Sequence, residues 1–118
     1  MPFSDYYRWF FGEIKRPEAE RILQRPENGH GSFLIRQNDN KGNLNIPFDW
    51  YRLSIKDGDL VKHYKIKTTD NGNYFIARRQ EFTTLHELVE HYKTSMDGLV
   101  ANLKEPCRKV IRQQKANG

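Results

Sequence analysis

Arg36 is the first residue in this sequence whose type and place point to chemistry. It ends the apolar run 33–35, and a guanidinium is rarely taken out of water unless a partner compensates for the lost hydration. A strand can simply end there with its side chain in water. The alternative is a pocket arginine that receives an anion, because its planar fork matches a carboxylate or a phosphate with two parallel hydrogen bonds. The local pattern leaves both interpretations open.

A second cluster of cations occupies residues 62–67, which read Lys-His-Tyr-Lys-Ile-Lys. Side chains of a strand alternate between the faces of a sheet, so His63 and Lys65 share one face. Lys62 and Tyr64 share the other. A run of charge usually forms a solvated face, but this run falls in the middle of the predicted sheet, which favours a binding role.

The patterns typical of enzymes are missing from the sequence, which has no G-x-x-x-x-G-K-[ST], no H-E-x-x-H and no G-x-S-x-G. The four histidines include no pair four residues apart, so we expect no metal site, and no feature indicates a cofactor. Cys107 is the only cysteine; it has no obvious base beside it and no disulfide partner. The sequence therefore favours a binding domain over an enzyme.

The net charge of +5 on 118 residues is unevenly placed. Residues 104–118 hold five cations and one anion, so the first 103 residues carry only +1. This argues against a uniformly basic surface that coats nucleic acid. Aromatic and lysine side chains do interleave near residues 62–75, as on base-stacking sheets, although these aromatics fit core positions more simply. A basic nucleic-acid-binding domain is the alternative function.

The composition fits one small globular domain, with 36% hydrophobic and 13% aromatic residues. No run of about 18 apolar residues and no apolar N-terminal signal stretch is present. A single cysteine fits a reducing compartment. We therefore expect a cytoplasmic protein with no segment inserted in a membrane.

Hydrophobic periodicity and turn signals predict the elements that must position these residues. A helix is predicted over 15–23 and a second from Thr84, where Thr84-Leu85-His86-Glu87 fits a capping box. The predicted strands between them are 32–36, 50–55, 60–67 and 74–77. Apolar side chains occur at both parities of the strands, so both sheet faces need cover. We predict an α+β fold, with a central antiparallel sheet sandwiched between two helices.

Several motifs together resemble the Src homology 2 domain. They are Trp9-Phe10-Phe11-Gly12, Glu18-Ala19-Glu20-Arg21, Gly31-Ser32-Phe33-Leu34-Ile35-Arg36, Lys62-His63-Tyr64-Lys65-Ile66, Leu85-His86-Glu87-Leu88-Val89-Glu90-His91-Tyr92 and Asp97-Gly98-Leu99. The match extends over residues 9–107 and is most similar to the Src-type non-receptor tyrosine kinases, including the Frk and Brk group. Residues 1–8 are then an N-terminal flank, and residues 108–118 a basic C-terminal linker. No kinase motif is present, so any kinase domain lies outside this sequence.

The resemblance implies a module that binds phosphotyrosine. In this family the arginine at the position of Arg36 clamps two phosphate oxygens, and it is expected to have no partner when the pocket is empty. Arg16 is implied to supply a second cation, and His63 and Lys65 to line the same pocket. Asn38 stands where the family has a serine that donates to the phosphate.

Arg52 departs from the family, in which its position is usually small, and the loop 37–50 that precedes it is longer than usual. The alternation of its strand puts Arg52 on the face opposite Tyr51. We hypothesise that Arg52 makes a compensating charge-assisted contact, either to the phosphate or to Asp39 or Asp49 of the longer loop. The alternative is a solvated arginine on a strand edge.

The other side of the sheet is implied to read the residues after the phosphotyrosine. By family position, the pocket for the third residue is walled by Tyr64, Ile76, Ala77, Tyr92, Gly98 and Leu99. Lys62 is placed to favour an acidic first residue. The implied peptide therefore has acidic residues and then an aliphatic third residue, although Ala77 stands where Src commonly has threonine.

The implied partner is a tyrosine-phosphorylated protein or peptide, or a phosphotyrosine within the parent chain. We expect a monomer that binds no nucleic acid. Any association with the inner face of the plasma membrane would come through the parent protein.

Overall fold

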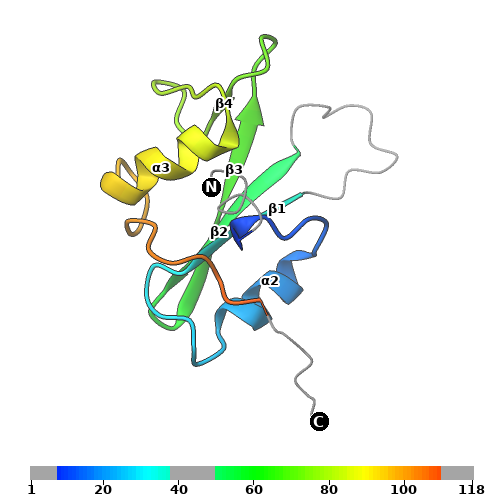
Figure 1. Ribbon diagram of the computed structural model, residues 1–118, viewed down its shortest axis with the longest axis vertical. Coiled ribbons are helices and arrows are strands. Elements are labelled where there is room, and N and C mark those ends of the chain that lie inside the picture. The colour runs from blue at the N-terminus through cyan, green and yellow to red at the C-terminus, as the bar shows by residue number, and fades with distance from the viewer. Residues whose placement is uncertain (1–7, 38–49, 110–118) are drawn as a thin grey trace.

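Residues 8–37 and 50–109 are the part of the chain that the computed structural model describes. Within it, α2 (Arg16–Leu23) and α3 (Leu85–Thr94) lie on opposite sides of a four-stranded antiparallel sheet (Figure 1). The strands follow the order of the chain: β1 (Phe33–Gln37), β2 (Tyr51–Asp57), β3 (Leu60–Thr68) and β4 (Tyr74–Phe75). The predicted α+β sandwich is confirmed. Neither described helix has the length and apolar character needed to cross a membrane.

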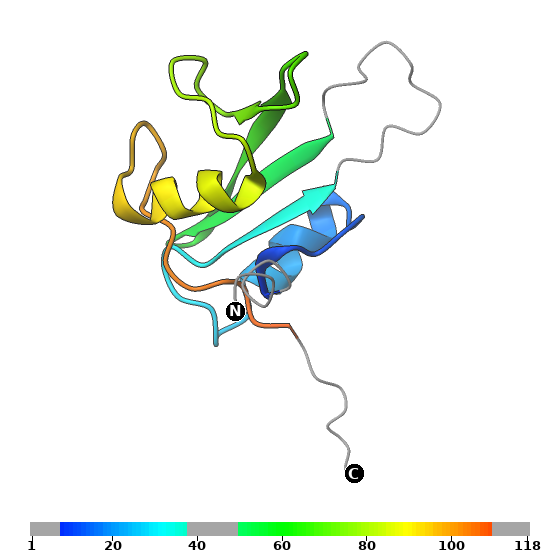
Figure 2. The ribbon, with the colours of Figure 1, turned by 45° about the horizontal axis from the view of Figure 1, so that its top comes forward.

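Alternation along β1 gives each face of the sheet its own core. Leu34 belongs to the core under α2, together with Ala19, Ile22, Leu23 and Cys107. Phe33 and Ile35 belong to the larger core under α3. The two helices are seen on either side of the sheet in Figure 2. Arg36 has the parity of Leu34, so it lies on the α2 face.

Most of the predicted element boundaries differ from the observed ones by one or two residues, and two of these differences have a clear local cause. Helix α2 begins at Arg16 because the backbone of Lys15 is extended, and Pro17 takes a place in the first turn that needs no N–H donor. Strand β4 ends at Phe75, two residues early. Tyr74 and Phe82 donate backbone hydrogen bonds to each other at 2.7 and 2.8 Å, which closes residues 76–81 into a loop.

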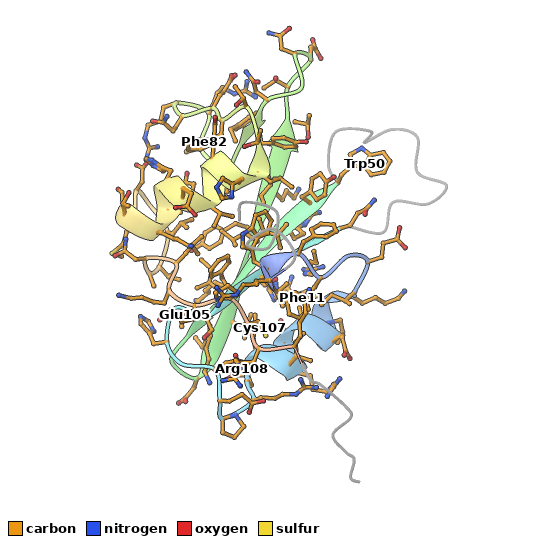
Figure 3. All side chains as sticks on the ribbon, viewed as in Figure 1. Phe11, Trp50, Phe82, Glu105, Cys107 and Arg108 are labelled. Atoms are coloured by element: carbon orange, nitrogen blue, oxygen red, sulfur yellow. The ribbon has the colours of Figure 1, made fainter. Side chains whose placement is uncertain are left out.

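The segment after residue 103 packs on the fold as far as residue 109, where the described part of the chain ends. The backbone N–H of Cys107 donates to the Phe33 carbonyl at 2.7 Å, and the thiol lies in the core under α2 (Figure 3). Burial raises the pKa of Cys107 to about 11, which keeps the thiol protonated and unreactive. Gly31 permits this path, because its φ is +87° and a Cβ there would meet the Lys104 side chain and lie 3.0 Å from the Asn102 carbonyl.

The predicted N-cap of α3 at Thr84 is confirmed and can be tested, although Glu87 accepts from the Thr83 N–H where a capping box would use that of Thr84. Thr84 Oγ1 accepts a hydrogen bond from the Glu87 N–H at 3.0 Å. We expect Thr84→Ala to lower the free energy of unfolding by about 1 kcal/mol in urea denaturation. The matched control is Thr83→Ala, because its backbone N–H still donates to Glu87 Oε1. Equal losses in the two variants would contradict the role of the Thr84 side chain.

Candidate functional site

Arg36 is buried at the end of β1, with 5% of the residue exposed. Its Nε–H donates to Ser54 Oγ at 3.2 Å, and its Nη2–H donates to His63 Nδ1 at 3.3 Å. The expectation that Arg36 has no partner in the empty site is therefore wrong. Both partners are neutral groups, so they orient the guanidinium without cancelling its charge.

A chain of hydrogen bonds continues from Arg36 to the surface of α2. Because Arg36 Nε donates to Ser54, the Ser54 hydroxyl proton is free to go to His63 Nδ1, 2.8 Å away. The ring then carries its proton on Nε2 and donates to Glu20 Oε2 at 2.8 Å. The same carboxylate oxygen accepts from Arg16 Nε at 3.3 Å. We call Arg16, Glu20, Arg36, Ser54 and His63 the polar network.

Burial sets the protonation of this network. It lowers the pKa of His63, and the positive charges of Arg36 and Arg16 act in the same direction, while the hydrogen bond to Glu20 opposes them. The ring is therefore neutral near pH 7. The hydrogen bond from His63 lowers the pKa of Glu20, which stays ionised. Burial and then the charges of Arg52 and Arg16 lower the pKa of Arg36, but a guanidinium is so basic that it stays charged near neutral pH.

The network opens into a cavity of about 520 Å³ on the α2 face. Five of the predicted site residues line this cavity: Arg16, Arg36, Arg52, His63 and Lys65. Glu13, Ile14 and Lys15, just before α2, complete the lining. The predicted residue Asn38 lies outside the described residues, as do Asp39 and Asp49. The cavity concentrates positive charge, which suits an anionic ligand.

Arg52 is one of the lining residues and is half-buried. It is the register partner of Arg36 on β1 and of Lys65 on β3. Its Nη1–H donates to the Tyr51 carbonyl at 3.2 Å. The positive charge of Arg52 helps to lower the pKa of Arg36.

Sequence reasoning missed Glu20 and Ser54. Strand parity, hairpin register and helix spacing could have indicated both residues. Ser54 has the parity of Arg52 on the same strand, and hairpin register pairs it with His63. Glu20 follows Arg16 by four residues, which places the two side chains on one face of a helix.

The residues predicted to read the peptide lie on the other side of the sheet. Tyr64 and Ile76 pack, partly exposed, against the core under α3, which includes the buried Tyr92 and Leu99. The Tyr64 hydroxyl accepts a hydrogen bond from the Val100 N–H at 3.0 Å, so β3 is tied to the loop after α3.

The remaining predicted residues lie on β3 and on the loops after β4 and α3. Lys62 has the parity of Tyr64 on β3 and is half-buried. Ala77 lies half-buried in the loop after β4, and Gly98 is exposed in the loop after α3.

Comparison with known families identifies the class of molecule that this sheet, cavity and buried arginine define. The model of the SH2 domain family matches residues 9–92. The chain belongs to this family and is therefore a phosphotyrosine-binding module. It is also 47% identical over 103 residues to human tyrosine-protein kinase FRK, an alignment that covers 86% of this chain.

That alignment covers only 19% of the human kinase. The chain thus corresponds to a binding module of such a kinase and contains no kinase domain.

The buried ring of His63 leads to a pH-dependent stability. Because the native state lowers its pKa, the unfolded chain binds more protons once the pH falls below the unfolded pKa of about 6.5. The free energy of unfolding should therefore fall as the pH is lowered from about 7.5 to about 5.5. This residue contributes at most about 1.4 kcal/mol per pH unit to that fall. In His63→Gln the free energy of unfolding should change less between these two pH values, as measured by urea denaturation at each.

The matched control is His30→Gln, which removes an exposed ring outside the polar network. In this control the free energy of unfolding should fall on acidification as it does in the unmodified chain. A pH dependence that is the same with and without His63 would contradict the assignment.

Proposed function

We propose that this chain binds peptides at a phosphotyrosine followed by acidic residues and an aliphatic third residue. The phosphate would enter the cavity on the α2 face and meet Arg36. The observation that carries the proposal is the buried guanidinium, whose hydrogen-bond partners among the described residues are both neutral. A buried charge without a counter-charge is costly, and a phosphate would supply that charge.

The chemistry of the ligand fits the cavity. Phosphotyrosine carries about −1.5 to −2 charges near neutral pH, with three strong acceptor oxygens. Arg36 would clamp two of them, and Arg16 and Lys65 would add charge at the rim. The depth of Arg36 would favour phosphotyrosine over phosphoserine, because the shorter side chain stops before it reaches the guanidinium.

Selectivity along the peptide would come from the α3 side of the sheet. The apolar group around Tyr64 and Ile76 is the candidate for the third-residue pocket, with Ala77, Tyr92, Gly98 and Leu99 as its other walls. Lys62 would favour an acidic first residue, since it stands on β3 beside Tyr64.

We further propose a domain over residues 9–107, a linker from residue 108, and a monomer in solution. The partner would be a phosphotyrosine of another protein or of the parent chain. Packing of Cys107 against β1 supports the extent of the domain. Nucleic-acid binding through the basic C-terminal residues has no support from the family assignment.

Replacing Arg36 by lysine tests the phosphate clamp. Arg36→Lys keeps the charge and removes the two-pronged geometry, so affinity for a phosphopeptide should fall by about 1.5–3 kcal/mol, or roughly 10- to 150-fold. Isothermal titration calorimetry measures the loss. The unphosphorylated and phosphoserine forms of the same peptide should bind neither protein measurably.

The control for this variant is Arg21→Lys, a change in an exposed arginine on α2 that pairs with Glu18. It should bind like the unmodified chain, and thermal unfolding of both variants checks that they are folded. Unchanged affinity of Arg36→Lys, or equal affinity for the unphosphorylated peptide, would overturn the proposed function.

The hypothesis for Arg52 has its own test. If its guanidinium helps to hold the phosphate, Arg52→Ala should lower phosphopeptide affinity by more than about 0.5 kcal/mol, beyond the range of ordinary surface substitutions. The matched control is Lys67→Ala, because Lys67 is an exposed cation of β3 that shares the sheet face of Arg52 and does not line the cavity. Equal, small effects of the two variants would remove Arg52 from the site.

A further inference from the structure

Asp97 has an unusual backbone conformation. Its φ is +42°, which makes it the only residue other than glycine with a positive φ in the described ranges 8–37 and 50–109. Gly98 follows with a φ of +96°, and the Leu99 N–H donates to the Met96 carbonyl at 2.8 Å to close the turn. Left-handed backbone is uncommon for residues with a Cβ, although aspartate tolerates it better than most.

The side chain of Asp97 is held by Arg79 and His91, which come from two other segments. Its Oδ1 accepts a hydrogen bond from Arg79 Nη2 at 2.6 Å, and the same nitrogen lies 3.4 Å from the Asp97 carbonyl. Its Oδ2 accepts from His91 Nε2, on α3, at 3.0 Å. These bonds lower the pKa of Asp97, with His91 the larger cause and Arg79 the next. The carboxylate is therefore ionised and joins α3 to both loops.

The two loops that Arg79 and Asp97 connect border the apolar group on the α3 side. One is residues 76–81 after β4, and the other is residues 95–102 after α3. Phe82, which ends the first loop, lies against α3 and packs on the His91 ring with centroids 5.1 Å apart (Figure 3).

The ion pair also lies close to a wall of the candidate pocket. Tyr92 is fully buried, and its hydroxyl has no hydrogen-bond partner among the described residues. Burial raises the pKa of Tyr92, the charge of Asp97 raises it further, and the charge of Arg79 opposes that rise. Leu99, another wall, is two residues beyond Asp97 in the same turn.

We propose that Arg79 and Asp97 form a clasp that holds the two loops together and thereby sets the selectivity for the third residue of the bound peptide. The inference rests on the proposed function. Arg79 acts here as a positioning residue, because its own contact is with Asp97. The clasp keeps the turn at residues 96–99 in its left-handed form, so Leu99 and Tyr92 stay in place before the peptide arrives. A preformed pocket loses less conformational freedom on binding than one that must be ordered.

The test compares two phosphopeptides that differ only in the third residue, isoleucine or alanine. The ratio of their dissociation constants measures the contribution of the pocket. Arg79→Ala should reduce this ratio by about two- to fivefold, the range that the coupling of an exposed ion pair permits. Its affinity for the alanine peptide should stay within about 1.5-fold of the unmodified chain, since phosphate binding is untouched.

Asp97→Asn separates the ion pair from the shape of the turn, because asparagine also tolerates a positive φ. It should reduce the ratio as Arg79→Ala does, and combining the two changes should reduce it no further. The matched control is Arg78→Ala, because Arg78 is the neighbouring exposed arginine and lies over the Phe75 ring at 5.0 Å. It should keep the full ratio.

Two outcomes would overturn the clasp alone. One is a ratio for Arg79→Ala within about 1.5-fold of that for Arg78→Ala, and the other is an equal loss of affinity for both peptides. Failure of the proposed function looks different, because the unmodified chain would then bind both phosphopeptides equally, bind neither, or bind the unphosphorylated forms as well.

Discussion

A buried guanidinium that keeps its charge is the constraint on which the rest of this structure depends. Arg36 needs hydrogen-bond partners because burial would otherwise be too costly, but a carboxylate beside it would occupy the place of a ligand. The structure solves this with Ser54 and His63, one from each of the next two strands. Antiparallel pairing of β1, β2 and β3 brings these side chains together on the α2 face.

Glu20 is the anion of the polar network, and it lies one step away from Arg36. It holds His63 and Arg16, so it fixes the tautomer of the ring and the position of the rim arginine. The ring in turn presents an acceptor nitrogen to Arg36. The negative charge of Glu20 thus positions Arg16 and the neutral ring of His63, while the guanidinium of Arg36 keeps neutral hydrogen-bond partners. Ionised Glu20 and neutral His63 are both consistent with the directions of their pKa shifts.

The fold could be predicted because period-2 alternation and turn signals are local, whereas the shared pocket of Arg16, Arg36, His63 and Lys65 was predicted from the resemblance to the Src homology 2 family. The five described cavity residues proposed from the sequence all line one space. Glu20 and Ser54 were missed because their roles come from pairing between elements, which needs strand register and helix docking. The Arg79–Asp97 pair was missed for the same reason, since its partners are 18 residues apart in two loops. The end of β4 depended on Phe82, whose pairing with Tyr74 is not visible in local periodicity.

Strand β3 carries both halves of the proposed recognition, and one tight turn keeps them on their proper faces. Asp57 pairs with Leu60 across a two-residue turn in which Gly58 has a φ of +60°, the first-position glycine of a type II′ hairpin. This turn fixes the register that puts Ser54 opposite His63. A slip of one residue would move His63 to the α3 core and Lys62 or Tyr64 to the side of Arg36. The turn at Gly58, remote in sequence from Arg36, therefore decides which side chains the buried guanidinium meets.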